Sequence, residues 1–141
     1  MSILDSDHVA VLKYTDGPQC SMLSDRMGHS ADQDFATTPV TVEEQMRGWL
    51  AVIHRRRDVH RQVPAYQQLT GLIDFFSRWK IVPFDSRSAD EFSRLRKLRI
   101  RIGTMDLKIA AIARVYDALL LASNLRDFER VPGLKVENWL R

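Results

Sequence analysis

The chain has 141 residues, the length of one ordinary domain, and its composition is that of an average globular protein, with 45% hydrophobic and 28% charged residues. This is enough apolar material for one core, so a metal is not needed for folding. Cys20 is the only cysteine, which excludes an intramolecular disulfide and any zinc site built on cysteine pairs. The net charge of +3 is weak evidence for a polyanionic partner.

The sequence shows no targeting or membrane signal. Residues 1–5 lack the basic start and the long apolar stretch of a signal peptide. The longest apolar run, 107–122, is interrupted by Lys108, Arg114 and Asp117, and no run approaches the roughly 18 to 20 residues that span a bilayer. With a single cysteine, this predicts a cytoplasmic protein with no membrane association.

Strand-like and helix-like segments alternate along the chain. Strands are predicted at 2–4, 35–41, 80–84, 118–123 and 134–139. Helices are predicted at 7–14 and 19–27, from residue 41, from residue 64, from residue 88, and at 105–116. This alternation predicts a single α/β domain, 1–141, built as a three-layer α/β/α sandwich with a mainly parallel central sheet. The helices that begin at residues 41 and 64 are predicted to form an antiparallel hairpin.

Three helix starts are predicted from capping residues. Thr41 is expected to cap one helix, with Glu44 in the capping-box position. Ser88 starts another capping box, and Thr104 is expected to cap the apolar helix after it. The segment 124–128 is expected to be a loop.

Four acids stand at or near junctions between these elements: Asp5, Glu44, Asp106 and Asp127. Taken singly, each is explained as a helix cap or as an acid that favours a helix start. As a set they are more informative, because carboxylates at the ends of several parallel strands and helices converge on one cleft. Mg²⁺ and Mn²⁺ prefer such oxygen ligands, and a divalent cation would offset the repulsion between the acids.

Four segments resemble the motifs of PIN-domain proteins, and in particular the VapC-like toxins of toxin–antitoxin pairs. Residues 3–8 are similar to the opening strand of the family, with Asp5 after a hydrophobic pair. Residues 41–48 resemble its second motif, in which a Glu precedes a Gly by four residues. Residues 102–111 are close to the third motif, and residues 123–134 resemble the closing motif. The order and spacing match over nearly the whole chain.

The resemblance implies a role for each matching residue. Asp5, Glu44 and Asp106 match the three acids that ligate metal in the family, and Asp127 matches a more variable fourth acid. Asp7 and Asn124 match polar neighbours of the metal, and Ser6 stands where Thr is commoner. The implied activity is that of an endoribonuclease dependent on Mg²⁺ or Mn²⁺. Metal in such a site lowers the pKa of a bound water, which makes hydroxide available near neutral pH. In-line attack by that water on the phosphodiester would leave a 5′-phosphate and a 3′-hydroxyl.

Basic residues form two clusters, and either is explained as a solvated helix face or as a surface for RNA. One, which could also meet an acidic partner, contains Arg55, Arg56, Arg57 and Arg61. The other, directly before Asp106, supplies the candidate RNA-binding residues Arg94, Arg96, Lys97, Arg99 and Arg101. The histidines lie outside the motifs, and for His8 a surface or packing role is expected.

The resemblance also implies partners: an RNA substrate, a second copy of the chain, and a small cognate antitoxin. The predicted hairpin, with Met46, Trp49 and Phe75 or Phe76 expected at its surface, is the candidate antitoxin-binding surface. An antitoxin arginine would compete with metal for the carboxylates.

Other functions remain open at this point. One is a PIN nuclease that works in RNA processing outside toxin systems. Another is a non-catalytic nucleic-acid-binding or interaction module that keeps the fold. A phosphatase-like hydrolase is a third, because Asp5-Ser6-Asp7 is formally an Asp-x-Asp pair.

Overall fold

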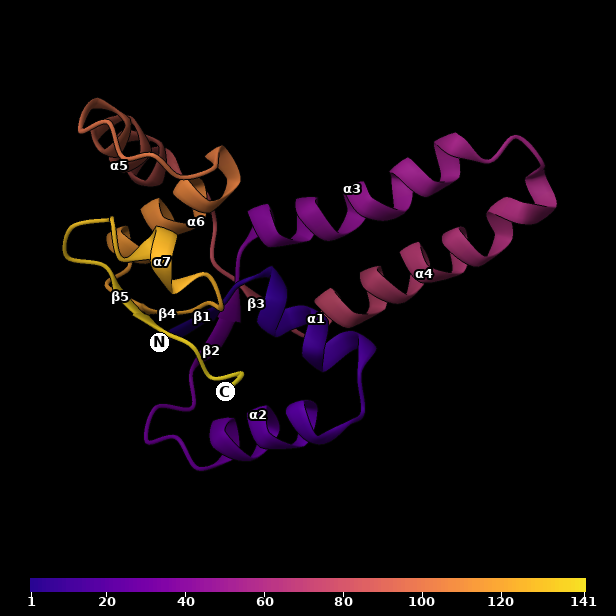
Figure 1. The fold of residues 1–141 in the computed structure, drawn as a ribbon, viewed down its shortest axis with the longest axis horizontal. Helices are drawn as coiled ribbons and strands as arrows, with labels where there is room; N and C mark the ends of the chain where they lie inside the picture. Colours follow the sequence, from indigo (N-terminus) through magenta and orange to yellow (C-terminus); the bar gives the residue numbers. More distant parts are fainter.

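The computed structural model describes residues 1–141 and contains one sheet of five parallel strands in the order β3-β2-β1-β4-β5 (Figure 1). The strands are β1 (Ser2–Leu4), β2 (Phe35–Thr37), β3 (Lys80–Ile81), β4 (Leu119–Leu121) and β5 (Lys135–Glu137). The central strand β1 pairs with β2 on one side and β4 on the other, with Ile3 opposite Ala36 and Leu120. The predicted α/β sandwich with a mainly parallel sheet is confirmed.

Seven helices connect the strands. They are α1 (Ser6–Tyr14), α2 (Pro18–Gly28), α3 (Pro39–Arg55), α4 (Val59–Ser77), α5 (Ser86–Lys97), α6 (Thr104–Val115) and the short α7 (Leu125–Phe128). None of them combines the length and apolar character that a membrane crossing requires.

The sheet separates two hydrophobic clusters, because successive side chains of a strand point to opposite faces. Ile3 and Leu120 belong to the cluster that contains the buried face of α6, whose residues 109–113 are almost completely buried. Their neighbours Leu4 and Leu121 belong to the other cluster, with side chains from α1, α2 and α4. Helices therefore cover both faces of the sheet.

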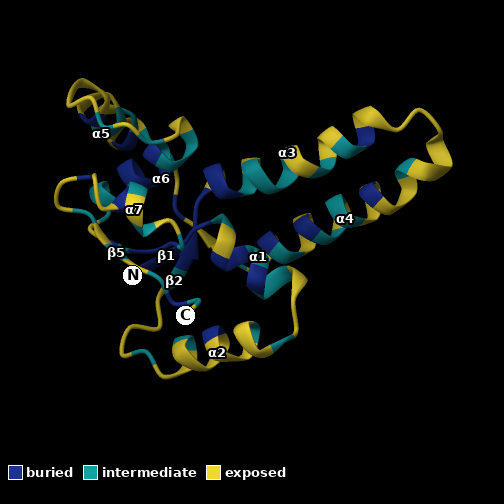
Figure 2. Ribbon diagram, in the orientation of Figure 1, coloured by how far each residue is buried: buried dark blue, intermediate teal, exposed yellow.

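The predicted antiparallel hairpin is formed by α3 and α4, which extend together as an arm away from the sheet (Figure 1). The arm is buried where it meets the sheet, at Val40, Leu72 and Phe76, and largely exposed toward its tip (Figure 2). Of the two candidates Phe75 and Phe76 for an exposed position, Phe76 is buried and Phe75 is half-buried, as are Met46 and Trp49.

All five strands run in the same direction, so their carboxyl ends share one edge of the sheet. The chain turns to opposite sides after β1 and β4, which is the place where ligands bind in open α/β sheets. Asp5 follows β1, and Ser123 and Asn124 follow β4 closely. The amino end of α6 lies at the same edge, since α6 leads back to the start of β4.

The start of α3 differs from the prediction. Its N-cap is Thr38, whose side-chain oxygen accepts a hydrogen bond from Thr41 N, and Pro39 is its first residue. Thr41 is therefore the third residue of the helix, and Glu44 lies in its second turn. The capping-box explanation of Glu44 is wrong.

Other helix starts also lie earlier than predicted. Helix α4 begins at Val59, capped by Asp58, with Pro64 inside the helix instead of at its start. Asp85, not Ser88, caps α5, and it accepts a hydrogen bond from Ser88 N at 2.9 Å. Thr104 is the first residue of α6 and makes no cap.

Strand β1 has the predicted bounds, the other four strands are shorter than predicted, and the expected loop at 124–128 contains the helical turn α7. Helix α3 takes over residues from Pro39 onward, because proline lacks the N–H needed for a strand ladder and suits the first turn of a helix.

Candidate functional site

Asp5 lies where β1 ends and α1 begins, and its two carboxylate oxygens differ in their surroundings. Its Oδ1 caps α1 by accepting hydrogen bonds from Asp7 N and His8 N, each at 3.1 Å. The side chain is mostly buried, and Oδ2 accepts no hydrogen bond from the protein. Asp5 is thus a cap and still has an oxygen available to a ligand.

Glu44 projects from the second turn of α3 with a buried oxygen, Oε1, that has no hydrogen-bond partner. Burial raises the pKa of Glu44, and the negative charges of Asp106, Asp5 and Asp7 raise it further. The hydroxyl of Ser6 opposes this effect, although neither Ser6 Oγ nor Glu44 Oε1 reaches hydrogen-bonding geometry. An unpaired buried carboxylate oxygen is costly, so it points to a ligand at this position.

Asp106 lies in the first turn of α6 and is half-buried. Burial is also the main cause that raises its pKa, followed by the negative charges of Asp5, Asp127 and Asp7. The nearby side chain of Asn124 opposes this effect and lowers the pKa in part. Asp106 is therefore influenced by acids from two other segments of the chain, the start of α1 and α7.

Asp127 belongs to the short helix α7, which the sequence did not predict. Asn124 Nδ2 donates a hydrogen bond to Asp127 Oδ2 at 2.8 Å, and Arg130 Nη1 lies 3.8 Å from Asp127 Oδ1. Asn124 thus orients the side chain of Asp127.

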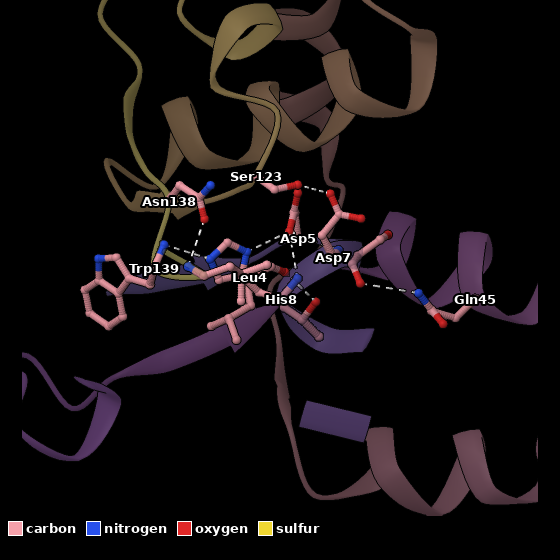
Figure 3. Close-up of polar contacts among 11 residues, drawn as sticks. Leu4, Asp5, Asp7, His8, Gln45, Ser123, Asn138 and Trp139 are labelled. Carbon is pink, nitrogen blue, oxygen red and sulfur yellow. Dashed lines mark hydrogen bonds and ion pairs between the residues drawn. The ribbon is translucent and has the colours of Figure 1, made fainter. Parts of the chain in front are cut away.

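Asp7 and Ser6, the other predicted supporting residues, begin α1. The hydroxyl of Ser123, next to Asn124, donates a short hydrogen bond to Asp7 Oδ2 (Figure 3). Gln45 Nε2 donates to the backbone oxygen of Ser6 at 3.5 Å (Figure 3). These contacts join α1 to the segment after β4 and to α3. Sequence analysis singled out neither Ser123 nor Gln45.

The charges of Asp5, Asp7, Asp106 and Asp127 act on the pKa of Glu44 or Asp106, which indicates that the predicted acids lie in one region, together with Asp7. However, no three His, Cys, Asp or Glu side chains lie close enough to form a ready-made metal site. The donor set nevertheless fits a hard divalent cation, because it consists of carboxylates, includes the unpartnered Glu44 Oε1, and carries raised pKa values that a cation would lower.

Of the two roles expected for His8, surface or packing, the structure excludes a surface position. Its ring is completely buried, with Nδ1 3.1 Å from Asp5 Oδ1 and Nε2 3.1 Å from Trp139 N (Figure 3). The signal in the sequence was its position three residues after Asp5, which brings a side chain in the first turn of a helix back to the cap.

The basic residues of the second cluster differ in their surroundings. Arg94 is paired with Glu91 through hydrogen bonds of 3.1 and 2.5 Å. Arg96 lies over the ring of Phe92, at 5.6 Å from its centre. Arg99 and Arg101 line an open hollow of about 390 Å³ together with Arg130, a residue that sequence analysis did not select.

A second open hollow, of about 340 Å³, lies beside Glu44 between α1 and α3. Its lining residues are Tyr14, Glu44, Gln45, Gly48, Trp49 and Val52. Trp49 Nε1 donates a hydrogen bond to Tyr14 Oη at 3.0 Å, which joins the two helices at this point. The hollow is therefore partly apolar and has a site carboxylate on its wall.

Comparison with known proteins shows the family to which the chain belongs. The model of the PIN domain family matches residues 25–134, which include Glu44, Asp106 and Asp127. The "Ribonuclease VapC" of Rickettsia bellii is 31% identical over 118 residues, a match covering 81% of this chain and 82% of the relative.

Other relatives match over shorter segments. The "Ribonuclease VapC2" of Haemophilus influenzae is 39% identical over 71 residues, covering 48% of this chain and 54% of the relative. The "tRNA(fMet)-specific endonuclease VapC" of Salmonella typhimurium is 33% identical over 69 residues, covering 46% and 52%. The chain thus spans about half the length of these two relatives.

Solved structures show the same fold. VapBC-1 from nontypeable Haemophilus influenzae has a TM-score of 0.76 at 17% identity, covering 99% of this chain and 98% of that one. VapBC2 from Rickettsia felis, bound to a promoter DNA fragment, has a TM-score of 0.73 at 22% identity, covering 98% of both chains. The chain belongs to the PIN-domain family and, within it, to the VapC proteins.

Proposed function

We propose that residues 1–141 form a single PIN domain that cleaves RNA with the help of Mg²⁺ or Mn²⁺, and that it is the toxin half of a toxin–antitoxin pair. The observation that carries the proposal is that Asp5, Glu44, Asp106 and Asp127, from four separate segments, are near enough for their charges to raise the pKa of Glu44 or Asp106, together with an unpartnered buried oxygen on Glu44.

Asp5, Glu44 and Asp106 would hold the metal, and Asp127 would assist, directly or through water. A divalent cation in such a site supplies positive charge for the scissile phosphate and makes hydroxide available from water near neutral pH. Asp5 keeps Oδ2 available because three N–H groups surround Oδ1. Asn124 orients Asp127, and Ser123 holds Asp7 near the same acids.

The hollow lined by Arg99, Arg101 and Arg130 is the proposed contact for the RNA backbone. Arg130 lies 3.8 Å from Asp127, so a phosphate bound there would be close to the acidic site. Arg96 and Lys97, exposed on α5, extend this basic surface, whereas the pairing of Arg94 with Glu91 makes Arg94 the weakest candidate of the cluster.

Transfer RNA is the first substrate class to test, ahead of ribosomal and messenger RNA. Two of the relatives are named for cleavage of tRNA(fMet), at 33% identity over 69 and 77 residues. Initiator tRNA is therefore a reasonable first substrate for this chain.

A small antitoxin would bind along the arm and the hollow beside Glu44. The half-buried Trp49 and the apolar part of the wall suit an amphipathic helix or strand, and an arginine from the antitoxin would pair with Glu44. A homodimer is also part of the proposal. Exposed apolar side chains at helical spacing on α4 would be covered by such a contact: Val59, Val63, Tyr66 and Ile73.

The decisive experiment compares wild type with Asp5→Asn and Asp106→Asn for cleavage of total RNA in Mg²⁺, in Mn²⁺ and in EDTA. Wild type should cleave only with metal, leaving 5′-phosphate ends, and both variants should fold and lose activity. Undiminished cleavage by either variant, or by wild type in EDTA, contradicts the proposal.

A nuclease of RNA processing, outside toxin systems, is the alternative. A toxin should arrest growth of the host cell when expressed alone, and co-expression of the neighbouring small reading frame should restore growth and yield a copurifying complex. RNA cleavage without growth arrest or complex would favour the alternative. A toxin function also assigns the protein to the cytoplasm, where its RNA substrates are.

A further inference from the structure

The completely buried ring of His8 lies directly behind Asp5. His8 is three residues after Asp5, in the first turn of α1, and its Nδ1 is 3.1 Å from Asp5 Oδ1. On its other side, Nε2 is 3.1 Å from the backbone nitrogen of Trp139, a residue 131 positions away in the chain (Figure 3).

The partner on the Trp139 side fixes the tautomer of the ring. The backbone N–H of Trp139 can only donate, so Nε2 must accept and carries no proton. The proton of the neutral ring is then on Nδ1, which donates to Asp5 Oδ1. The orientation of the ring is thus determined from both ends.

Asp5 Oδ1 therefore receives three N–H groups, each at 3.1 Å: those of the Asp7 and His8 backbone and that of the His8 ring. Oδ2 receives none. Three donors on one oxygen prevent the carboxylate from rotating, and they keep the other oxygen available outside the helix cap.

The anchor behind His8 is itself well held. The Trp139 ring packs edge-on against Phe35 at 6.1 Å, the guanidinium of Arg26 lies 4.7 Å from it, and its Nε1 donates to Glu137 Oε2 at 2.7 Å. Because these contacts hold Trp139 in place, its backbone N–H keeps the His8 ring in one orientation. The His8 ring can in turn hold the Asp5 carboxylate in one orientation.

We propose that His8 is a positioning residue that orients Asp5 for a divalent metal, by donating from Nδ1 to Asp5 Oδ1 while the C-terminal segment holds Nε2. This inference rests on the proposed metal-dependent function. Partners of this kind, which hold a metal ligand without touching the metal, typically change metal affinity about 10- to 100-fold when they are removed.

Two variants separate this role from a merely structural one, in which His8 only ties the C-terminal segment to α1. In His8→Asn the amide nitrogen occupies the place of Nδ1, so the donor to Asp5 is kept and the acceptor for Trp139 is removed. In His8→Gln the side chain reaches one bond further, so its oxygen accepts from Trp139 N–H and Asp5 loses the ring donor.

The experiment titrates Mn²⁺ into metal-free wild type and both variants, with calorimetry or the electron paramagnetic resonance of free Mn²⁺ as the readout. Asp106→Asn, titrated in parallel, shows that the binding measured is that of this site. We expect His8→Asn to bind nearly as wild type does and His8→Gln to bind about 10- to 100-fold more weakly. Equal affinity in all three proteins, equal weakening in both variants, or weakening in His8→Asn alone overturns the inference and leaves the proposed function standing.

If wild type itself binds no Mn²⁺, the inference and the metal-dependent function fail together. A second measurement does not depend on the folding of variants. Long-range ¹H–¹⁵N spectra of wild type should show the His8 proton on Nδ1, and addition of Mg²⁺ should shift the Nδ1 resonance. A proton on Nε2, or no shift with Mg²⁺, overturns the inference.

Discussion

The side-chain oxygen of Thr38 accepts a hydrogen bond from the backbone N–H of Thr41 at 3.1 Å, and this bond determines where α3 begins. Since the helix starts at Pro39, Glu44 lies in the second turn and its carboxylate is not used for capping. It is therefore free to join Asp5 and Asp106, which stand at other junctions of the sheet edge.

Replacement of Thr38 by Val should lower the free energy of unfolding by about 1–2 kcal/mol, because a buried N–H at the start of α3 loses its partner. Thr41→Val is the matched control and should cost less, since Thr41 keeps its N–H and Thr38 still caps the helix. Urea denaturation measures both. If Thr41→Val lowers the free energy of unfolding more than Thr38→Val does, Thr41 is the N-cap, and the capping-box prediction was right.

The sequence predicted the order of strands and helices because apolar periodicity depends on many residues at once. It failed at the helix starts, where Thr37, Thr38 and Thr41 stand within a few positions and any of them is a possible cap. Only the position of Pro39, directly after Thr38 and at the start of the helix, distinguishes Thr38 as the cap.

The candidate acids were found from spacing and from a family resemblance, since each stands near a junction between elements. Arg130 and the role of His8 were not. Arg130 contacts Arg101, and the His8 ring is held from behind by Trp139. Both partners are far away in the sequence, so no local pattern predicts these two contacts.

Asp106→Asn should stabilise the metal-free protein. Burial and neighbouring acids raise the pKa of Asp106, so its ionised form is disfavoured in the folded state and stability falls as pH rises from the usual pKa through the raised one. At pH 7 in EDTA we therefore expect the variant to melt at a higher temperature than wild type, measured by thermal unfolding. With Mn²⁺ the order should reverse, because only wild type gains full stabilisation from binding. A variant that is less stable than wild type in EDTA would contradict the crowding of acids.

Tyr116→Phe should lower the stability of the folded protein more at neutral pH than in acid. Tyr116 Oη donates to Asp85 Oδ2 at 2.7 Å, and this is the largest cause that lowers the pKa of Asp85 from 3.8 to about 2. The stability that this bond contributes is complete above pH 4 or so and is lost as pH falls toward 2. The difference in melting temperature between wild type and variant should therefore shrink from pH 7 to pH 2. Tyr66→Phe, at an exposed position, is the control, and a Tyr116→Phe difference that stays constant with pH would refute the prediction.

Arg130→Gln and Arg101→Gln should each weaken RNA binding and reduce its dependence on salt. The slope of log K against log salt should fall in magnitude by about 0.7–1 for each phosphate that the variant no longer neutralises. Arg94→Gln should have little effect, because Arg94 is already paired with Glu91. Fluorescence anisotropy with labelled RNA, in the Asp106→Asn background to prevent cleavage, measures all three. A larger decrease in affinity with Arg94→Gln than with Arg130→Gln would contradict the proposed RNA contact.

The central claim is that acids from separate segments share one divalent cation. It is tested most directly by the anomalous difference map of a crystal grown with Mn²⁺. We predict a peak about 2.0–2.2 Å from carboxylate oxygens of Asp5 and Asp106, with Glu44 beside it. A map without a peak at the carboxyl edge of the sheet, at Mn²⁺ concentrations that support RNA cleavage, would contradict it.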